Sequence, residues 1–172
     1  PIRDVAIKVF KDLDANDSWE QEIDSLRVLG KLAGVVDLVT AGRDSRNRPY
    51  IVSEFVPGPT LHELIAQNEN AKRQMDDGDV HRYLVQVLRA LVGVHAARPT
   101  PMAVAGNTEP LEDLAEGDQI TQANDVLVHG DIKPSNVIID SRDDDVILID
   151  FGISRIASRS SSGSGMEYSD HL

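Results

Sequence analysis

The sequence predicts an α+β fold, because patterns typical of strands and patterns typical of helices both recur along its 172 residues. Short runs rich in β-branched residues indicate strands, and apolar residues spaced three and four positions apart indicate amphipathic helices. Hydrophobic residues make up 41% of the chain and charged residues 27%, a balance typical of a globular domain. We therefore expect one domain with a core of mainly aliphatic side chains.

The first part of the chain is expected to hold three strands and one helix. Ser18 and Gln21 have the spacing of a capping box, and the apolar residues that follow recur at helical spacing, so a helix is predicted over residues 18–31. A polar turn at residues 43–48 joins two of the strands. The strands are expected at residues 5–10, 35–40 and 50–56.

A proline and glycine break at residues 57–59 separates the two parts of the chain. Thr60 and Glu63 then have capping-box spacing, which predicts a short helix. Residues 98–125 lack periodicity and carry many acids, so an acidic loop is expected there, and a mobile Ser/Gly-rich tail at residues 158–165. Short strands are expected at residues 126–128, 137–139 and 146–149. A long amphipathic helix between the break and the acidic loop is expected to bury Val80, Leu84, Val87, Leu91 and Val94.

The net charge of −12 argues against a nucleic-acid-binding surface, since phosphate backbones are bound by basic faces. The same acidity disfavours adsorption to anionic membranes, and the longest apolar runs are far too short to span a bilayer. The absence of cysteine excludes disulfides and thiolate metal sites. The expected protein is soluble and cytoplasmic, and because the first residue is Pro1, its true start is expected to be missing.

Two short segments carry residues suited to phosphate chemistry. In the loop at residues 129–136, Asp131 and Asn136 lie five positions apart, with Lys133 between them. Asp150 follows at the end of an apolar strand. Carboxylate and amide oxygens are ligands for Mg²⁺, and a nearby lysine can stabilise negative phosphate oxygens. A lone aspartate in a loop more often caps a turn, but the combined residue types and spacing favour phosphoryl transfer over a purely structural role.

In their order along the chain, these motifs resemble those of the eukaryotic-type serine/threonine protein kinases. The resemblance implies a bilobal fold, with residues 1–56 as a partial small lobe and residues 57–172 as the hinge and part of the large lobe. It also implies an ion pair between Lys8 and Glu22 that holds the lysine against the phosphates of ATP. Glu20 is the rival partner, and Glu22 is preferred because Leu26 continues its face toward the core.

The resemblance further assigns residues to nucleotide binding. The backbone of Glu54 and Val56 would pair with adenine, and Ser53 would be a small gatekeeper. Ala6 and Ile138 would form the apolar walls around the purine. An internal spine joining the lobes would consist of Leu26, Leu38, His129 and Phe151.

The resemblance also assigns the catalytic loop. Asp131 would orient the substrate hydroxyl and accept its proton, and Lys133 would stabilise the γ-phosphate. Asn136 and Asp150 would hold Mg²⁺, so the expected cofactors are ATP and Mg²⁺. The run Lys133-Pro134-Ser135-Asn136 is the form this family uses with serine and threonine substrates in proteins.

The sequence also departs from the family pattern. No glycine-rich loop precedes Val5, and no Ala-Pro-Glu follows the activation segment, so the bilobal fold is expected to be incomplete. A partner or a missing chain segment would then cover an exposed apolar surface of the large lobe. Residues 98–125 would be an insertion. Gly130 stands where the family usually has an arginine. Phosphorylation of the serines that begin at Ser158 is therefore less expected to switch the activity of the protein.

Two alternatives remain beside a protein kinase or a fragment of one. His129-Gly130-Asp131 also opens the catalytic loop of small-molecule kinases related to aminoglycoside and choline kinases, although Lys133 speaks against them. The chain could instead be a catalytically inactive binding module that retains the kinase fold. The presence of five residues with assigned catalytic or binding roles argues against such an inactive module. They are Lys8, Glu22, Asp131, Asn136 and Asp150.

Overall fold

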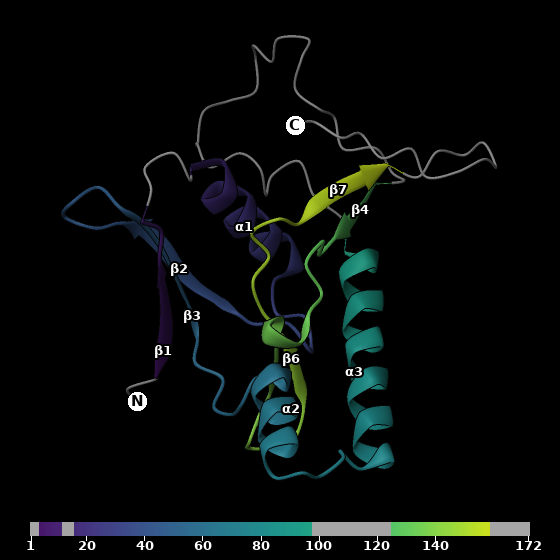
Figure 1. Cartoon of the computed structure of the whole chain (residues 1–172). Coiled ribbons are helices and arrows are strands. Elements are labelled where there is room, and N and C mark those ends of the chain that lie inside the picture. Colours follow the sequence, from purple (N-terminus) through teal and green to yellow (C-terminus); the bar gives the residue numbers. More distant parts are fainter. Residues whose placement is uncertain (1–3, 12–15, 98–124, 159–172) are drawn as a thin grey trace.

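The computed structural model describes residues 4–11, 16–97 and 125–158, and Figure 1 shows how their strands and helices are arranged. The first part of the chain forms a three-stranded antiparallel sheet with the strand order β1-β3-β2. Helix α1 packs against strands β2 and β3 of this sheet. These elements are β1 (Val5–Val9), α1 (Asn16–Leu29), β2 (Leu38–Arg43) and β3 (Pro49–Glu54).

The register of the sheet fixes the position of Lys8. Strand β1 pairs with β3 so that Lys8 lies opposite Ile51 and Ala6 lies opposite Ser53. The turn between β2 and β3 is closed by Asp44, whose carboxylate accepts hydrogen bonds from two backbone amides. Asn47 supplies the positive φ of 62° that this turn needs, a conformation that asparagine tolerates well.

The second part of the chain packs two helices against two short two-stranded sheets. The Thr60–Glu63 capping box is present at the start of the first helix, as the sequence predicts. Strand β5 pairs with β6, and strand β4 pairs with β7. The elements are α2 (Leu61–Asn70), α3 (Asp77–Ala96), β4 (Asp125–Val128), the 3-10 turn η2 (Pro134–Asn136), β5 (Val137–Ile139), β6 (Val146–Leu148) and β7 (Arg155–Ser158).

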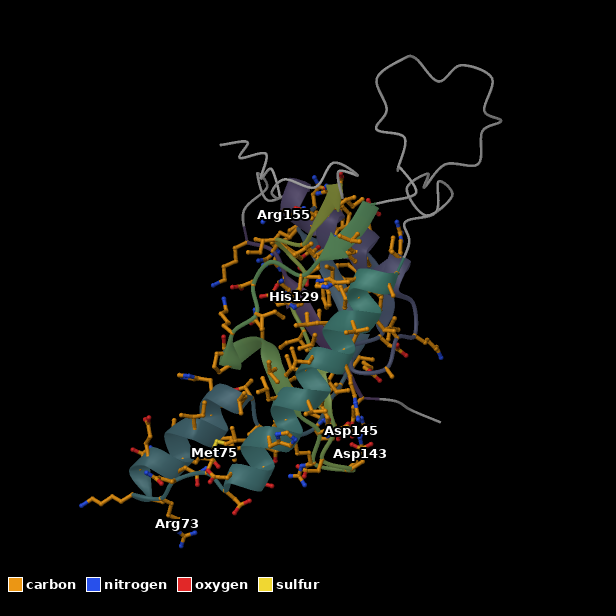
Figure 2. All side chains as sticks on the ribbon, turned by 90° about the vertical axis from the view of Figure 1, so that its right-hand side faces the viewer. Arg73, Met75, His129, Asp143, Asp145 and Arg155 are labelled. Carbon is orange, nitrogen blue, oxygen red and sulfur yellow. The ribbon has the colours of Figure 1, made fainter. Side chains whose placement is uncertain are left out.

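Side-chain hydrogen bonds attach α3 to the turn between β5 and β6. The Gln86 side chain accepts a hydrogen bond from the Val146 amide at 2.6 Å, and the Tyr83 hydroxyl donates to Asp144 at 3.0 Å. Figure 2 shows Asp143 and Asp145 on this turn, beside the N-terminal half of α3. The core continues from α1 through β6 to α3, so both parts of the chain share buried apolar contacts.

Several of the predicted element boundaries are wrong, among them the end of the second strand, which runs over Leu38–Arg43 rather than residues 35–40. Helix α1 begins at Asn16, so Ser18 lies within its first turn and does not cap it. Val35 and Val36 do not belong to a strand of the first sheet, because both pair with Leu148 of β6. Asp125 belongs to strand β4 rather than to the acidic loop, whose remaining residues, 98–124, lie outside the described part of the chain.

The predicted apolar face of α3 is also partly wrong. Val80 and Leu84 are exposed, whereas Tyr83 and Ala90 are buried together with Val87 and Val94. Compared with the prediction, the helix is turned about its axis. The face with Tyr83, Val87, Ala90 and Val94 is buried, and α3 packs against strands β4 and β6. Strand β7, at Arg155–Ser158, was not expected, and residues 159–165 of the predicted tail lie outside the described part of the chain.

No helix within the described ranges is both long enough and apolar enough to cross a membrane.

Candidate active site

A cavity of about 310 Å³ lies between the first sheet and the β5–β6 hairpin, a size typical of small-molecule sites. All seven residues assigned to nucleotide binding line it, and Asp150 lines it as well. The remaining walls are apolar and were not assigned to the nucleotide site from the sequence. The seven are Ala6, Lys8, Glu22, Ser53, Glu54, Val56 and Ile138.

Lys8 forms ion pairs with two carboxylates from distant parts of the chain. Its Nζ lies 2.6 Å from Glu22 and 2.8 Å from Asp150. Partial burial disfavours the Lys8 ammonium, but the hydrogen bonds and charges of Asp150 and Glu22 outweigh this effect, so its pKa is raised. Glu22 is only 4% exposed, whereas Glu20 is exposed on the outer side of α1. The preference for Glu22 over Glu20 is therefore confirmed as far as the ion pair is concerned.

Asp150 lies just after β6 with a left-handed backbone conformation, φ 64°. Such a φ is uncommon for a residue other than glycine and persists where the surroundings determine it. Here the Ile149 amide donates to the Asn136 carbonyl at 3.0 Å, and Phe151 is fully buried. The strained residue is thus held between two fixed neighbours, with its carboxylate directed to Lys8.

His129 connects the loop at residues 129–136 to the segment before Asp150. Its Nδ1 accepts a hydrogen bond from the Asp131 amide, so Nδ1 carries no proton. The proton is on Nε2, which donates to the Ile149 carbonyl at 3.1 Å. Burial lowers the pKa of His129, which agrees with a neutral ring. Its ring also packs against Phe151, with centroids 4.3 Å apart, and Figure 2 shows His129 in the interior.

Of the other two residues assigned to the spine, Leu26 is buried and Leu38 is partly buried. Both belong to the same apolar core as Phe151.

A compact polar cluster in the loop at residues 129–136 consists of Asp131, Lys133 and Asn136. Lys133 Nζ lies 2.5 Å from the Asp131 carboxylate, and the Asn136 side-chain amide donates to the same carboxylate at 2.9 Å. These hydrogen bonds, led by that of Lys133, lower the pKa of Asp131, so its carboxylate is ionised at neutral pH. The cluster does not line the cavity itself, and the Asn136–Ile149 bond connects it to Asp150.

Gly130 is required by the shape of this loop. Its φ is 83°, and a Cβ at this position would lie 2.6 Å from the Ile153 carbonyl oxygen. A larger residue would therefore need a different path of the backbone.

Backbone hydrogen bonds attach the segment after β3 to β5. The Ile139 amide donates to Pro59 at 2.9 Å, and the Ser141 amide donates to Pro57 at 2.8 Å. Gly58 allows this close approach, because a Cβ there would lie 2.0 Å from the Ile139 carbonyl. The attachment brings Ile138 to the wall of the cavity that Ala6 also lines, a placement that depends on contacts between distant segments.

Several residues at the site were missed or given another role by the sequence analysis. Val36, Ile51 and Ile149 line the cavity, but as isolated apolar residues they are indistinguishable from core positions in the sequence. No cluster of three or more acidic, histidine or cysteine side chains arranged for a metal ion occurs among the described residues. A magnesium site here would thus need ligands from bound phosphates or water.

This arrangement is typical of enzymes that transfer a phosphoryl group from a nucleotide. The chain belongs to the protein tyrosine and serine/threonine kinase family, whose family model matches residues 2–169.

Curated relatives agree with this family. The chain is 27% identical over 137 residues to the serine/threonine-protein kinase PknA of Nostoc sp. strain PCC 7120, and the match covers 80% of this chain and 19% of PknA. It is 29% identical over 165 residues to PknL of Mycobacterium tuberculosis, covering 92% of this chain and 32% of PknL. Against human cyclin-dependent kinase-like 5 it is 30% identical over 168 residues, 95% of this chain and 14% of that protein. The chain therefore spans a third or less of these relatives.

Proposed function

We propose that this chain forms the ATP-binding and catalytic centre of a protein kinase that phosphorylates serine and threonine. The observation that carries the proposal is the double ion pair of Lys8 with Glu22 and Asp150, at 2.6 and 2.8 Å, at the wall of a nucleotide-sized cavity. Such a lysine can hold the α and β phosphates of ATP while one carboxylate orients it. Because ATP is supplied inside cells, the proposal includes a cytoplasmic location.

In the proposed reaction, a serine or threonine hydroxyl oxygen attacks the terminal phosphorus of ATP, and the bond to the ADP oxygen breaks. Asp131 orients the hydroxyl and accepts its proton, because it is ionised and fixed by Asn136. Lys133 stabilises the negative oxygens of the transferred group. Adenine is proposed to bind between Ala6 and Ile138, beside Ser53 and the backbone of Glu54 and Val56.

Asn136 and Asp150 are the residues proposed to hold Mg²⁺. The Asn136 amide nitrogen donates to Asp131, so its amide oxygen is directed away from that carboxylate. An amide oxygen and a carboxylate are hard ligands that suit Mg²⁺, which takes its other ligands from phosphate and water. When bound, the ion neutralises charge on the phosphates.

The proposal also divides the chain near residue 56 into two lobes that close the cavity between them. It includes an apolar contact surface on α3 for a partner or a further chain segment. The support for such a surface is the exposure of four apolar side chains on that helix: Val80, Leu84, Leu88 and Val92.

Thermal unfolding of the full chain with and without Mg·ATP tests the binding part of the proposal. At about 100 times its Kd, the nucleotide should stabilise the chain by about 2.7 kcal/mol, seen as a higher Tm. Lys8→Met should abolish this shift, and Lys11→Met, an exposed lysine three positions away, should leave it unchanged. A shift that persists in Lys8→Met would contradict the assigned role of Lys8.

Transfer of labelled phosphate tests the substrate class. A generic basic protein should be labelled on serine or threonine, and Lys8→Met should lower the rate about hundredfold or more. Labelling of aminoglycoside or choline instead would favour the small-molecule kinase. No nucleotide-dependent shift, either for this chain or for a version extended by its natural flanking sequence, would favour a binding module.

A further inference from the structure

A pair of buried hydroxyl groups joins α1 to the turn that follows Asp150. Ser25 Oγ lies 2.5 Å from Ser154 Oγ, although the two residues are 129 positions apart in the sequence. Ser25 is 5% exposed and Ser154 is fully buried. Neither residue lines the nucleotide cavity, so the pair has no place in substrate contact. Burying two hydroxyls is unfavourable unless they are paired, which makes this contact informative.

The hydrogen bonds of this pair run in one direction. Ser154 Oγ donates to the Phe151 carbonyl at 2.6 Å, and the Ser154 amide donates to the same carbonyl at 3.0 Å. A hydroxyl has only one hydrogen to donate, so Ser25 must be the donor to Ser154. Ser25 therefore depends on Ser154 for its acceptor, while Ser154 keeps its own acceptor without Ser25.

The turn is attached to α1 at both of its ends. Lys8 joins Glu22 to Asp150, just before the turn, and Ser25, three residues after Glu22 on the helix, bonds Ser154 at the end of the turn. The Gln21 side-chain amide also donates to the Ser154 carbonyl. Residues three apart on a helix lie on the same side, so the two attachment points match in spacing.

We propose that Ser25 and Ser154 are positioning residues for phosphoryl transfer, which hold Glu22 and Asp150 against Lys8 at the same time. Glu22 lies one helical turn before Ser25, and Asp150 immediately precedes the turn that runs from Phe151 to Ser154. Loss of the pair lets α1 and the turn separate, so Lys8 loses a partner. The catalytic consequence rests on the proposed kinase function, whereas the effect on Lys8 can be measured without it.

A double-mutant cycle on the unfolding of the full chain tests the directed pair. Ser154→Ala should raise the unfolding equilibrium constant about tenfold, because it leaves the buried Ser25 hydroxyl without an acceptor. Ser25→Ala should have a smaller effect, and adding it to Ser154→Ala should cause no further loss. If the effects of the two substitutions on the unfolding equilibrium constant instead multiply in the double variant, Ser25 does not donate to Ser154 as proposed.

The reactivity of Lys8 tests the positioning role in the absence of nucleotide. The full chain is acetylated with sulfosuccinimidyl acetate, and site-resolved mass spectrometry gives the ratio of Lys8 to Lys11 modification. Ser25→Ala and Ser154→Ala should each raise this ratio, by roughly threefold, as expected for loss of a partly exposed ion pair. Val94→Ala, a buried change on α3, controls for general destabilisation and should leave the ratio unchanged.

An unchanged ratio in both serine variants, or an equal rise in Val94→Ala, would overturn the positioning role. If Ser154→Ala does not fold, the comparison of Ser25→Ala with Val94→Ala decides alone. Failure of Mg·ATP to stabilise the unmodified chain would refute the proposed function, but it would leave the acetylation result unaffected. The two failures are therefore distinguishable.

Discussion

At the scale of single residues, the site depends on charges whose neighbours set their protonation. Lys8 is held between two acids, and Asp131 is held between Lys133 and Asn136. The two aspartates differ in their surroundings: Asp131 is fixed by residues of its own loop, whereas Asp150 depends on a lysine 142 positions away. The residues of the short loop could therefore be proposed together from the sequence, whereas the Lys8–Asp150 ion pair was not predicted, because its two residues lie far apart in the sequence.

The pH dependence of transfer should report the Lys133–Asp131 contact. In the proposed reaction Asp131 must be ionised to accept a proton, and the hydrogen bond from Lys133 is the main cause of its lowered pKa, so this contact should hold the acid limb of activity at lower pH. Lys133→Met removes that cation, the pKa of Asp131 rises, and the acid limb of kcat/KM should move to higher pH. Lys31→Met, an exposed lysine after α1, is the control. An acid limb that stays in place would show that Asp131 does not govern it.

Gly130 offers a residue-scale test of the loop geometry. Gly130→Ala should destabilise the chain by about 2 kcal/mol or more, because the positive φ costs roughly 1–2 kcal/mol and the added Cβ meets the Ile153 carbonyl. Gly30→Ala is a matched control, since Gly30 also has a positive φ, 56°, but nothing lies within 4 Å of its Cβ position. Urea unfolding measures both. Equal losses for the two variants would contradict the close contact at Gly130.

At the scale of elements, periodicity predicts which segments are helical better than it predicts which face is buried. The α3 segment has apolar residues on more than one side, so Val80 and Leu84 fit a helical stripe as well as Val87 and Val94 do. Contacts with β4 and β6 then select the face that contains Tyr83. Strand β7 was missed because its partner β4 lies about thirty residues earlier in the sequence.

Neighbouring apolar residues of α3 should respond very differently to truncation. Val94→Ala should lower the free energy of unfolding by about 2 kcal/mol, because its side chain is fully buried. Leu88→Ala should change it by less than about 0.5 kcal/mol, because Leu88 is 53% exposed despite its larger side chain. Denaturant unfolding of the two variants measures this difference. A larger loss for Leu88→Ala would mean that this face of α3 is covered in solution.

At the scale of the whole molecule, the two parts of the chain meet around the cavity through a few defined connections. The segment after β3 is bonded to β5, the residues after α1 are bonded to β6, and α1 is bonded to the turn after Asp150. The family resemblance named seven residues for the nucleotide, and all seven line the cavity. The Ser25–Ser154 pair could not be predicted, because two serines 129 positions apart carry no local pattern.

These connections predict that Mg·ATP should protect both sides of the cavity together. In hydrogen exchange of the full chain, the Glu54 amide, bonded to Asp37, and the Ile149 amide, bonded to Asn136, should both slow, by up to about hundredfold at 100 times the Kd. The Ala71 amide, at the far end of α2, should change little if opening there is local. Lys8→Met should remove the protection on both sides, since Lys8 bridges α1 and Asp150. Protection restricted to one side would contradict a nucleotide that bridges the two parts of the chain.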